Sequence, residues 1–217
     1  SNDGKIVLSS PVTKVVINSK KVIGIEIEGK LQKFDKVICT IPLPYIPSLI
    51  PDLPKDILLK FKAQKNIAVV CIIVKLKKPL TENFWLNTND DDMDIPGIVE
   101  YTNLRPLDQH IVYVPFYMPG EHPKFKEDNS VFINKVRRYM QKINPHLRDD
   151  DFIDMRASRY RYAQPICDPG YLNKLPPVAL PIDGLWVADT SYYYPEDRGI
   201  SESIDFGRKL AKTIHNL

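Results

Sequence analysis

The chain has 217 residues, of which 43% are hydrophobic and 26% charged, as expected for a folded globular protein with a sizeable core. Its 30 basic and 27 acidic residues are mixed along the chain and give a net charge of +3, which argues against a dedicated nucleic-acid binder. The longest apolar run, 67–74, is far too short to cross a bilayer, so no membrane span is expected.

The cysteines and histidines indicate the compartment and exclude a metal site. Cys39, Cys71 and Cys167 lie far apart in the sequence, which favours free thiols in a reducing environment, and we expect a cytoplasmic protein. The four histidines show no metal-ligand spacing, so no metal is predicted. The opening Ser1-Asn2-Asp3-Gly4 lacks the apolar core of a signal peptide and is interpreted as a tag remnant or the edge of an excised fragment.

The first predicted elements form a β-meander. Alternation of apolar and polar residues predicts strands over 13–18, 22–28 and 31–34, separated by short polar turns. The next apolar stretch, 36–41, predicts a short strand buried on both faces, as in parallel or mixed sheets. Two short helices are predicted at 44–50 and 54–62, each with a proline near its start.

The middle of the chain predicts an antiparallel sheet backed by a helix. Strands are predicted at 67–76, 84–86, 98–101, 111–116 and 152–162, and apolar residues at helical spacing predict a helix over 129–143. The acidic stretch 87–94 lacks the glycine and the distant glutamate of a calcium-binding loop, so a solvated loop is predicted there.

The last predicted elements are a buried strand at 185–188 and a helix at 200–215. Asp189 would lie at the carboxyl end of that strand, where α/β proteins bind ligands. The helix would offer unpaired N–H groups from Ile200 and Ser201 to a phosphate or an electron-rich ring edge. The alternative is structural, with Asp189 tightening the loop and Asp197 capping the helix.

Two motifs resemble the flavin-dependent amine oxidase superfamily, which includes protoporphyrinogen oxidases and phytoene desaturases. The first is Gly184-Leu185-Trp186-Val187-Ala188-Asp189, followed by Arg198-Gly199 and by Phe206-Gly207. The second is the strand D-x-V-I-x-T-x-P that follows the meander, with Asp35, Val37, Ile38, Thr40 and Pro42 in the matching positions. Together the motifs cover about 80 residues, and the middle matches only in general character.

This resemblance implies an FAD-dependent oxidoreductase with a small-molecule substrate. It implies that Val12 lies beside the adenine, that Asp189 binds the ribityl or pyrophosphate region, and that Gly199, Ile200 and Ser201 adjoin the flavin. The middle sheet would form the substrate pocket over the flavin. No catalytic residue is assigned, because the cofactor supplies the chemistry in flavin oxidations.

Two departures limit the resemblance. The family's glycine before the aspartate is Ala188 here, and a methyl group hinders close backbone approach to a ligand. The Gly-x-Gly-x-x-Gly loop is absent, so we expect that an N-terminal dinucleotide-binding half is missing, that this fragment alone holds FAD weakly or not at all, and that it is inactive.

The predicted fold is α+β, with an antiparallel substrate-domain sheet and flanking helices inserted into the residual strands and C-terminal helix of an FAD-binding α/β domain. The expected divisions are 1–44 for the residual FAD-binding part, 45–180 for the substrate-binding domain and 181–217 for the closing strand and helix.

Two other functions remain open. A flavin-dependent nucleotide-sugar mutase, an isomerase, would use Arg156, Arg159, Arg161 and the nearby tyrosines to bind its substrate. A non-catalytic binding module could keep the same fold, and Ala188 is compatible with that. The substrate and the choice among oxidation, desaturation and isomerisation do not follow from the sequence.

Overall fold

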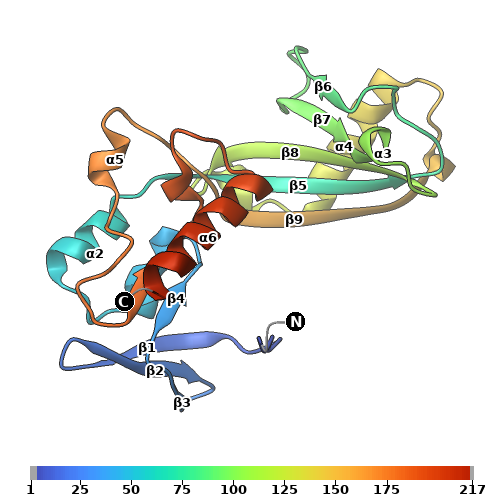
Figure 1. Ribbon diagram of the computed structural model, residues 1–217. Helices are drawn as coiled ribbons and strands as arrows, with labels where there is room; N and C mark the ends of the chain where they lie inside the picture. The colour runs from blue at the N-terminus through green and yellow to red at the C-terminus, as the bar shows by residue number, and fades with distance from the viewer. Residues whose placement is uncertain (1–3, 216–217) are drawn as a thin grey trace. The chain divides into compact units, whose positions relative to one another are not determined.

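The computed structural model describes residues 4–215 (Figure 1). The opening residues 1–3, interpreted above as a remnant, and residues 216–217 lie outside this range. The chain forms two compact units: unit 1 contains the residues up to Lys65 and those from Gln164 onward, and unit 2 contains Asn66–Ala163. These packing units differ in their bounds from the predicted functional domains, because the helices between 46 and 62 pack into the core of unit 1. The functional division therefore stays a prediction.

Unit 1 begins with the predicted meander. Strands β1 (Val12–Asn18), β2 (Lys21–Ile27) and β3 (Lys30–Lys33) form an antiparallel sheet in the order β1-β2-β3. Backbone hydrogen bonds tie this sheet to the segment before the last strand, since the N–H of Val22 donates to the Asp183 carbonyl (2.9 Å).

A second sheet of unit 1 joins segments far apart in the sequence. Strands β4 (Val37–Cys39) and β10 (Leu185–Val187) pair in parallel, with β4 at an edge. The prediction that this first strand is buried on both faces is wrong, because Ile38 is 43% exposed. The sheet has two strands in the described chain, so one edge of β4 is unpaired there, and the side of β4 that carries Ile38 is partly exposed.

The helices of unit 1 surround these strands. They are η1 (Leu43–Tyr45), α1 (Ile46–Leu49), α2 (Lys55–Lys62), α5 (Tyr171–Lys174), η4 (Thr190–Tyr193) and α6 (Ile200–His215). The unit's core contains Leu43, Ile46 and Phe61 from the first three helices. Within residues 4–215 no helix is both long and apolar enough to cross a membrane.

Unit 2 is built on a five-stranded antiparallel sheet in the order β6-β7-β8-β5-β9. The strands are β5 (Asn66–Leu76), β6 (Trp85–Asn87), β7 (Gly97–Glu100), β8 (His110–Pro119) and β9 (Phe152–Pro165), whose last two residues belong to unit 1. The connections contain α3 (Tyr101–Leu104), η2 (Pro123–Lys126), α4 (Asn129–Ile143) and η3 (Asp149–Asp151). The strands and the long helix predicted for this region are confirmed, apart from small differences at their ends.

Helix α4 covers one face of this sheet. The apolar stripe of α4 packs on the inward side chains of β5 and β8, and the rings of Phe116 and Phe132 meet edge-to-face at 5.1 Å. Period-two alternation sends the remaining side chains of β5 and β8 to the opposite face.

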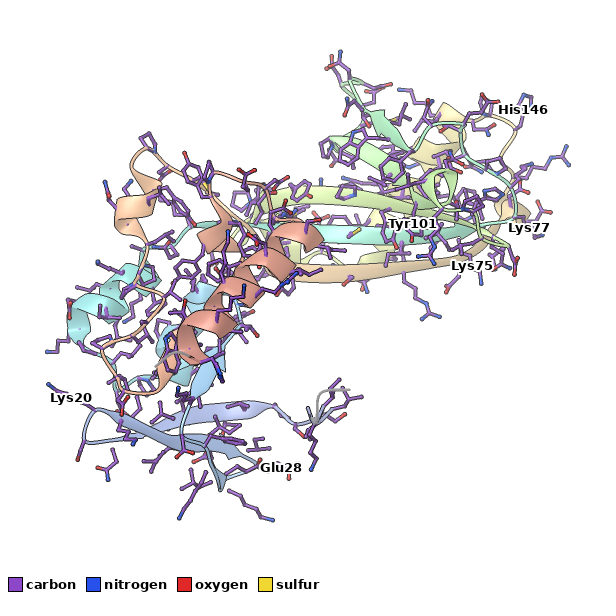
Figure 2. All side chains as sticks on the ribbon, viewed as in Figure 1. Lys20, Glu28, Lys75, Lys77, Tyr101 and His146 are labelled. Atoms are coloured by element: carbon purple, nitrogen blue, oxygen red, sulfur yellow. The ribbon has the colours of Figure 1, made fainter. Side chains whose placement is uncertain are left out.

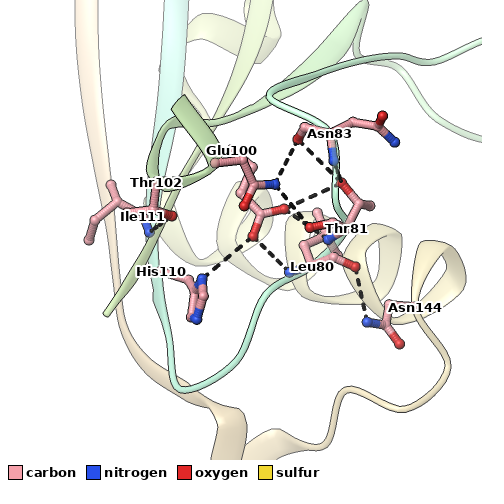
Figure 3. Close-up of polar contacts among 9 residues, drawn as sticks. Leu80, Thr81, Asn83, Glu100, Thr102, His110, Ile111 and Asn144 are labelled. Carbon is pink, nitrogen blue, oxygen red and sulfur yellow. Dashed lines mark hydrogen bonds and ion pairs between the residues drawn. The ribbon is translucent and has the colours of Figure 1, made fainter. Parts of the chain in front are cut away.

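A buried carboxylate holds the loop after β5. Glu100, at the end of β7, is almost fully buried and accepts hydrogen bonds from the backbone N–H groups of Leu80 (2.9 Å) and Thr81 (2.8 Å) (Figure 3). His110 Nδ1 lies 3.9 Å from Glu100 Oε1. Asn103 binds the same loop by donating to the carbonyls of Thr81 and Asn83.

The acidic stretch 87–94 is largely exposed, as predicted, and its carboxylates also pair with other residues of unit 2. Lys142 bridges Asp90 and Asp92. Asp94 accepts hydrogen bonds from Tyr139 Oη (2.7 Å) and Lys135 Nζ (2.9 Å), and also pairs with Lys124. No cluster that could hold a metal ion occurs in the part of the chain that the structure describes.

The Asp94 contacts give unit 2 an acid-sensitive element. Burial raises the pKa of Asp94, but the hydrogen bonds from Tyr139 and the two lysines outweigh burial and hold this pKa far below its usual value. Because the folded-state pKa is lowered, the ionised carboxylate stabilises the fold above about pH 4, and this stabilisation is lost as the pH falls through the folded-state pKa.

We expect Asp94→Asn to lower the free energy of unfolding at neutral pH by about 1 kcal/mol, a value that allows for solvent screening of this 40% exposed side chain. The variant should also lose less stability than the wild type on acidification. Urea unfolding at several pH values checks both effects. Asp91→Asn, an exposed neighbour, should match the wild type, and equal acid sensitivity of all three proteins would contradict the account.

Candidate nucleotide-binding edge and open sheet face

The first candidate site lies where β10 ends in unit 1. Asp189 follows β10, and its two carboxylate oxygens accept hydrogen bonds from the backbone N–H groups of Leu43 (2.9 Å) and Ser191 (2.8 Å). The first bond ties the carboxyl end of β10 to the segment that follows β4, and the second caps η4. Asp189 therefore tightens the loop, which is the structural alternative considered for this residue. A carboxylate that accepts two hydrogen bonds still has lone pairs for a further donor such as a ribityl hydroxyl.

The environment of Asp189 changes its titration. Burial raises the pKa of Asp189, and the hydrogen bonds from the N–H groups of Leu43 and Ser191 oppose that rise. The preceding Ala188 is buried, and its N–H donates to the Cys39 carbonyl (2.9 Å). The methyl group that replaces the family's glycine thus lies at the junction of the two strands.

We expect Asp189→Ala to destabilise unit 1 by about 2 kcal/mol, because it leaves the N–H groups of Leu43 and Ser191 without their acceptors. Relief of the buried charge offsets part of this loss, since the raised pKa means that ionisation is unfavourable in the fold. Asp183→Ala is the matched control: Asp183 is exposed and pairs with Lys21 at 3.8 Å, so its loss should change stability by less than about 0.5 kcal/mol. Denaturant unfolding compares the two, and equal losses would contradict a linking role for Asp189.

The start of α6 supplies the second part of this site. Ile200 and Ser201 are the first residues of the helix, so their N–H groups have no carbonyl one turn earlier to bind. Gly199 precedes them, and the Glu202 carboxylate folds back over it, close to where a Cβ at Gly199 would lie. Glu202 is a flexible side chain, and an anionic or electron-rich ligand at this helix end would have to displace it. Sequence reasoning missed this feature, since nothing in the pattern of the segment places Glu202 over Gly199.

Val12 belongs to the meander of unit 1. It opens β1, where it pairs with Ile27 of β2, and its side chain is exposed. No hydrogen bond or ion pair in the described chain connects Val12 with Asp189 or with the start of α6. The structure therefore brings Gly199, Ile200 and Ser201 together, and it supplies no direct link from them to Val12.

Apolar surface is exposed around this candidate site. Helix α6 turns Ile200 (83% exposed) and Ile204 (57%) outward, and Gly207 and Ala211 on the same helix are exposed. Ile38 on the edge strand β4 is exposed too. A parallel pair of strands with an exposed apolar residue and a free edge is unusual, because parallel sheets are normally covered on both faces. Contiguous exposed apolar surface is typical of interaction sites.

The second candidate site is the face of the unit 2 sheet opposite α4, which we call the open face. Its rows follow from the strand register: Trp85 pairs with Val99, Val99 with Tyr113, and Tyr113 with Ile73. The remaining β5 and β8 residues on this face are Ile67, Val69, Cys71, Lys75, Ile111, Pro115, Tyr117 and Pro119. Tyr160 of β9 also lies there, on the side opposite its neighbour Arg159.

The arginines of β9 do not form a common pocket. Arg159 points towards α4, where its guanidinium lies 5.6 Å from the Phe132 ring centroid and donates to the Phe125 carbonyl (3.0 Å). Arg161, on the same side, pairs with Glu121. Arg156 lies on the opposite side and pairs with Asp154 (2.7 Å). The arginine grouping considered for a nucleotide-sugar substrate is thus divided between two faces.

A parallel strand pair and a separate antiparallel five-stranded sheet give a mixed α/β fold similar to that of amine-oxidase-type oxidoreductases. The sequence profile described as flavin containing amine oxidoreductase matches residues 1–195. The chain therefore belongs to this family, as its two motifs predict.

Solved structures show the same fold. An oxidoreductase from Methanosarcina mazei is 18% identical with a TM-score of 0.59, and the match covers 83% of this chain and 43% of that protein. A proposed protoporphyrinogen oxidase from Exiguobacterium sp. 255-15 is 15% identical with a TM-score of 0.65, over 84% of this chain and 42% of that protein. A reduced UDP-galactopyranose mutase is 14% identical with a TM-score of 0.55, over 76% and 36%.

The chain thus spans less than half the length of these structural neighbours. At these identities the likeness concerns the fold alone. A comparison with curated protein sequences gave no significant match.

Proposed function

We propose that this chain is the substrate-binding part, together with the closing strand and helix, of a cytoplasmic FAD-dependent oxidoreductase. The observation that carries the proposal is the parallel β4–β10 pair, which ends at Asp189 and leaves an edge strand and the apolar side of α6 uncovered. A dinucleotide-binding half that adds strands beside β4 and packs on α6 would complete such a sheet.

The residues present fit part of an FAD site. Asp189 keeps lone pairs for a hydroxyl donor, and the N–H groups of Ile200 and Ser201 suit the electron-rich edge of the flavin pyrimidine. Val12 is proposed to contact the adenine through its backbone. The described chain has no glycine-rich loop for the pyrophosphate, and Glu202 lies over Gly199. This chain alone is therefore expected to hold FAD weakly or not at all.

In the complete protein these residues would orient the cofactor, and the open face of unit 2 would hold the small-molecule substrate. FAD, when bound, would accept hydride from a C–N or C–C bond of that substrate. Residues of the open face would bind the substrate and exclude water from it. The three cysteines are free, which suits a reducing compartment.

Flavin binding by a longer chain tests this proposal. A protein that adds the segment encoded immediately upstream should purify with stoichiometric FAD and show flavin absorbance, whereas the 217-residue chain should be colourless and inactive. Bleaching of the bound flavin by an amine or a polyene would support an oxidase or desaturase. A colourless longer chain would contradict the proposal and favour a non-catalytic module.

The mutase alternative has one supporting observation, the shared fold with a reduced UDP-galactopyranose mutase. The positions of Arg159 and Arg161 weigh against it, because both are engaged on the α4 side of the sheet. Activity on a nucleotide sugar that requires prior dithionite reduction, without net oxidation, would select this alternative.

A further inference from the structure

The open face of unit 2 has an apolar centre. Along β5 its residues are Ile67, Val69, Cys71 and Ile73, and β8 places prolines and tyrosines opposite them. Burial raises the pKa of the Cys71 thiol, so this side chain stays neutral as well. The centre of the face therefore offers apolar and aromatic contacts and no charge.

One end of the face carries a cation. Lys75 continues the β5 row opposite Ile111, between the core residues Val74 and Leu76, so it shares the side of the sheet with Ile73. No ion pair of Lys75 occurs among the described residues. Its neighbours are engaged, since Lys77 pairs with Asp150 (3.8 Å).

Two other basic residues near this end are in ion pairs. Lys78 pairs with Asp151 (2.8 Å), and Arg156 pairs with Asp154 (2.7 Å). Figure 2 shows Lys75 and Lys77 at the same end of the sheet. Lys75 is thus a cation at this end of the open face to which a ligand anion can bind without displacing a carboxylate.

We propose that the open face binds an elongated apolar substrate that carries a single carboxylate, with the carboxylate at Lys75. The row from Ile67 to Lys75 covers eight residue steps, or about 26 Å of extended strand, which suits a long molecule. An amine would need a carboxylate at this end, and Asp154 is already paired. A nucleotide sugar would need several cations. The inference rests on the proposed role of unit 2 in substrate binding.

Titration of the 217-residue chain with a fluorescent long-chain polyene carboxylate and with its methyl ester tests this assignment. The acid should bind about 3- to 10-fold more tightly than the ester, the range expected for one partly exposed ion pair. Lys75→Met should remove the difference by weakening the acid alone. Lys77→Met, a lysine at the same end, should leave the difference intact. Equal binding of acid and ester by the wild type, or equal effects of the two variants, would overturn the proposal.

A second pair of variants locates the apolar body of the ligand. Ile73→Asp should weaken both ligands at least about 10-fold, because it places a charge in the centre of the row. Val131→Asp, on α4, has a matched exposure of 38% against 37% for Ile73 and should change neither affinity. Circular dichroism confirms that both variants are folded. Absence of binding by the wild type, or a dimer that covers this face in size-exclusion chromatography, would overturn the assignment.

These outcomes are separable from the proposed function. If the longer chain binds FAD but the open face does not prefer the acid, only the substrate assignment fails. If the open face binds the acid as described but the longer chain binds no FAD, the oxidoreductase proposal fails and the binding surface stands.

Discussion

Glu100→Ala is expected to lower the free energy of unfolding of unit 2 by about 3–5 kcal/mol. The substitution leaves two backbone donors, the buried N–H of Leu80 and the partly buried N–H of Thr81, without the carboxylate that now accepts from both. Hydrogen bonds to a charged group are stronger than neutral ones, and an unpaired buried N–H group is destabilising by a further 1–3 kcal/mol or so. The lost side-chain volume adds to this, because Glu100 is almost fully buried.

The control for this prediction is a glutamate in the same loop. Glu82 is exposed, so Glu82→Ala should change stability by no more than about 0.5 kcal/mol. Glu100→Gln should lie between the two, since its amide oxygen still accepts one of the two hydrogen bonds. Urea unfolding of the three variants measures the series. If Glu100→Ala and Glu82→Ala have the same effect, the carboxylate does not hold the loop as described.

Gly184→Ala is expected to destabilise unit 1 by about 3 kcal/mol or more. Gly184 has φ +78°, a left-handed conformation that disfavours a side chain by about 1 kcal/mol. A Cβ there would lie 2.3 Å from the Asp35 carbonyl oxygen, which is backbone and cannot move aside alone. The Gly184 carbonyl also accepts from the Val37 N–H (2.8 Å), so relief of the clash would separate β4 from β10.

Gly170→Ala separates the effect of the left-handed φ from the effect of the clash with Asp35. Gly170 has a similar φ of +72°, but a Cβ there would meet nothing within 4 Å. This control should therefore show only the conformational effect, about 1 kcal/mol. Thermal or urea unfolding compares the variants. A loss at Gly184 no larger than that at Gly170 would show that the close contact with Asp35 is unimportant, and with it the reason for glycine at this position of the family motif.

Most elements follow from local patterns in the sequence. The alternation of Ile23, Ile25 and Ile27 with polar residues predicts β2, and the spacing of Val136 and Met140 predicts the buried side of α4. The four-residue helices α3 and α5 escape prediction, because one turn leaves no periodic signal. The exposure of Ile38 on β4 was not predicted either. An apolar strand sequence predicts burial whether or not the segments that would cover the strand belong to the chain.

The sequence locates the elements of the candidate site, but it does not give the contacts between residues that are far apart in the chain. Asp189 and the start of α6 lie at positions that the strand and helix signals fix. The bond from the Leu43 N–H to Asp189 joins residues 146 positions apart, and no local pattern encodes it. The open face could have been found, because the residues of β5 that alternate with the core must face the other way. The orientation of Arg159 depends on α4 and needed the structure.

In the proposed complete protein, the free edge of β4 and the apolar side of α6 pack against a dinucleotide-binding half. Amide hydrogen exchange tests it most directly, by comparing the 217-residue chain with the longer, FAD-loaded protein. Exchange in β4 and α6 should slow by at least about 10-fold in the longer protein, while β8 in the core of unit 2 should change little. Unchanged exchange rates in β4 and α6 would contradict the account.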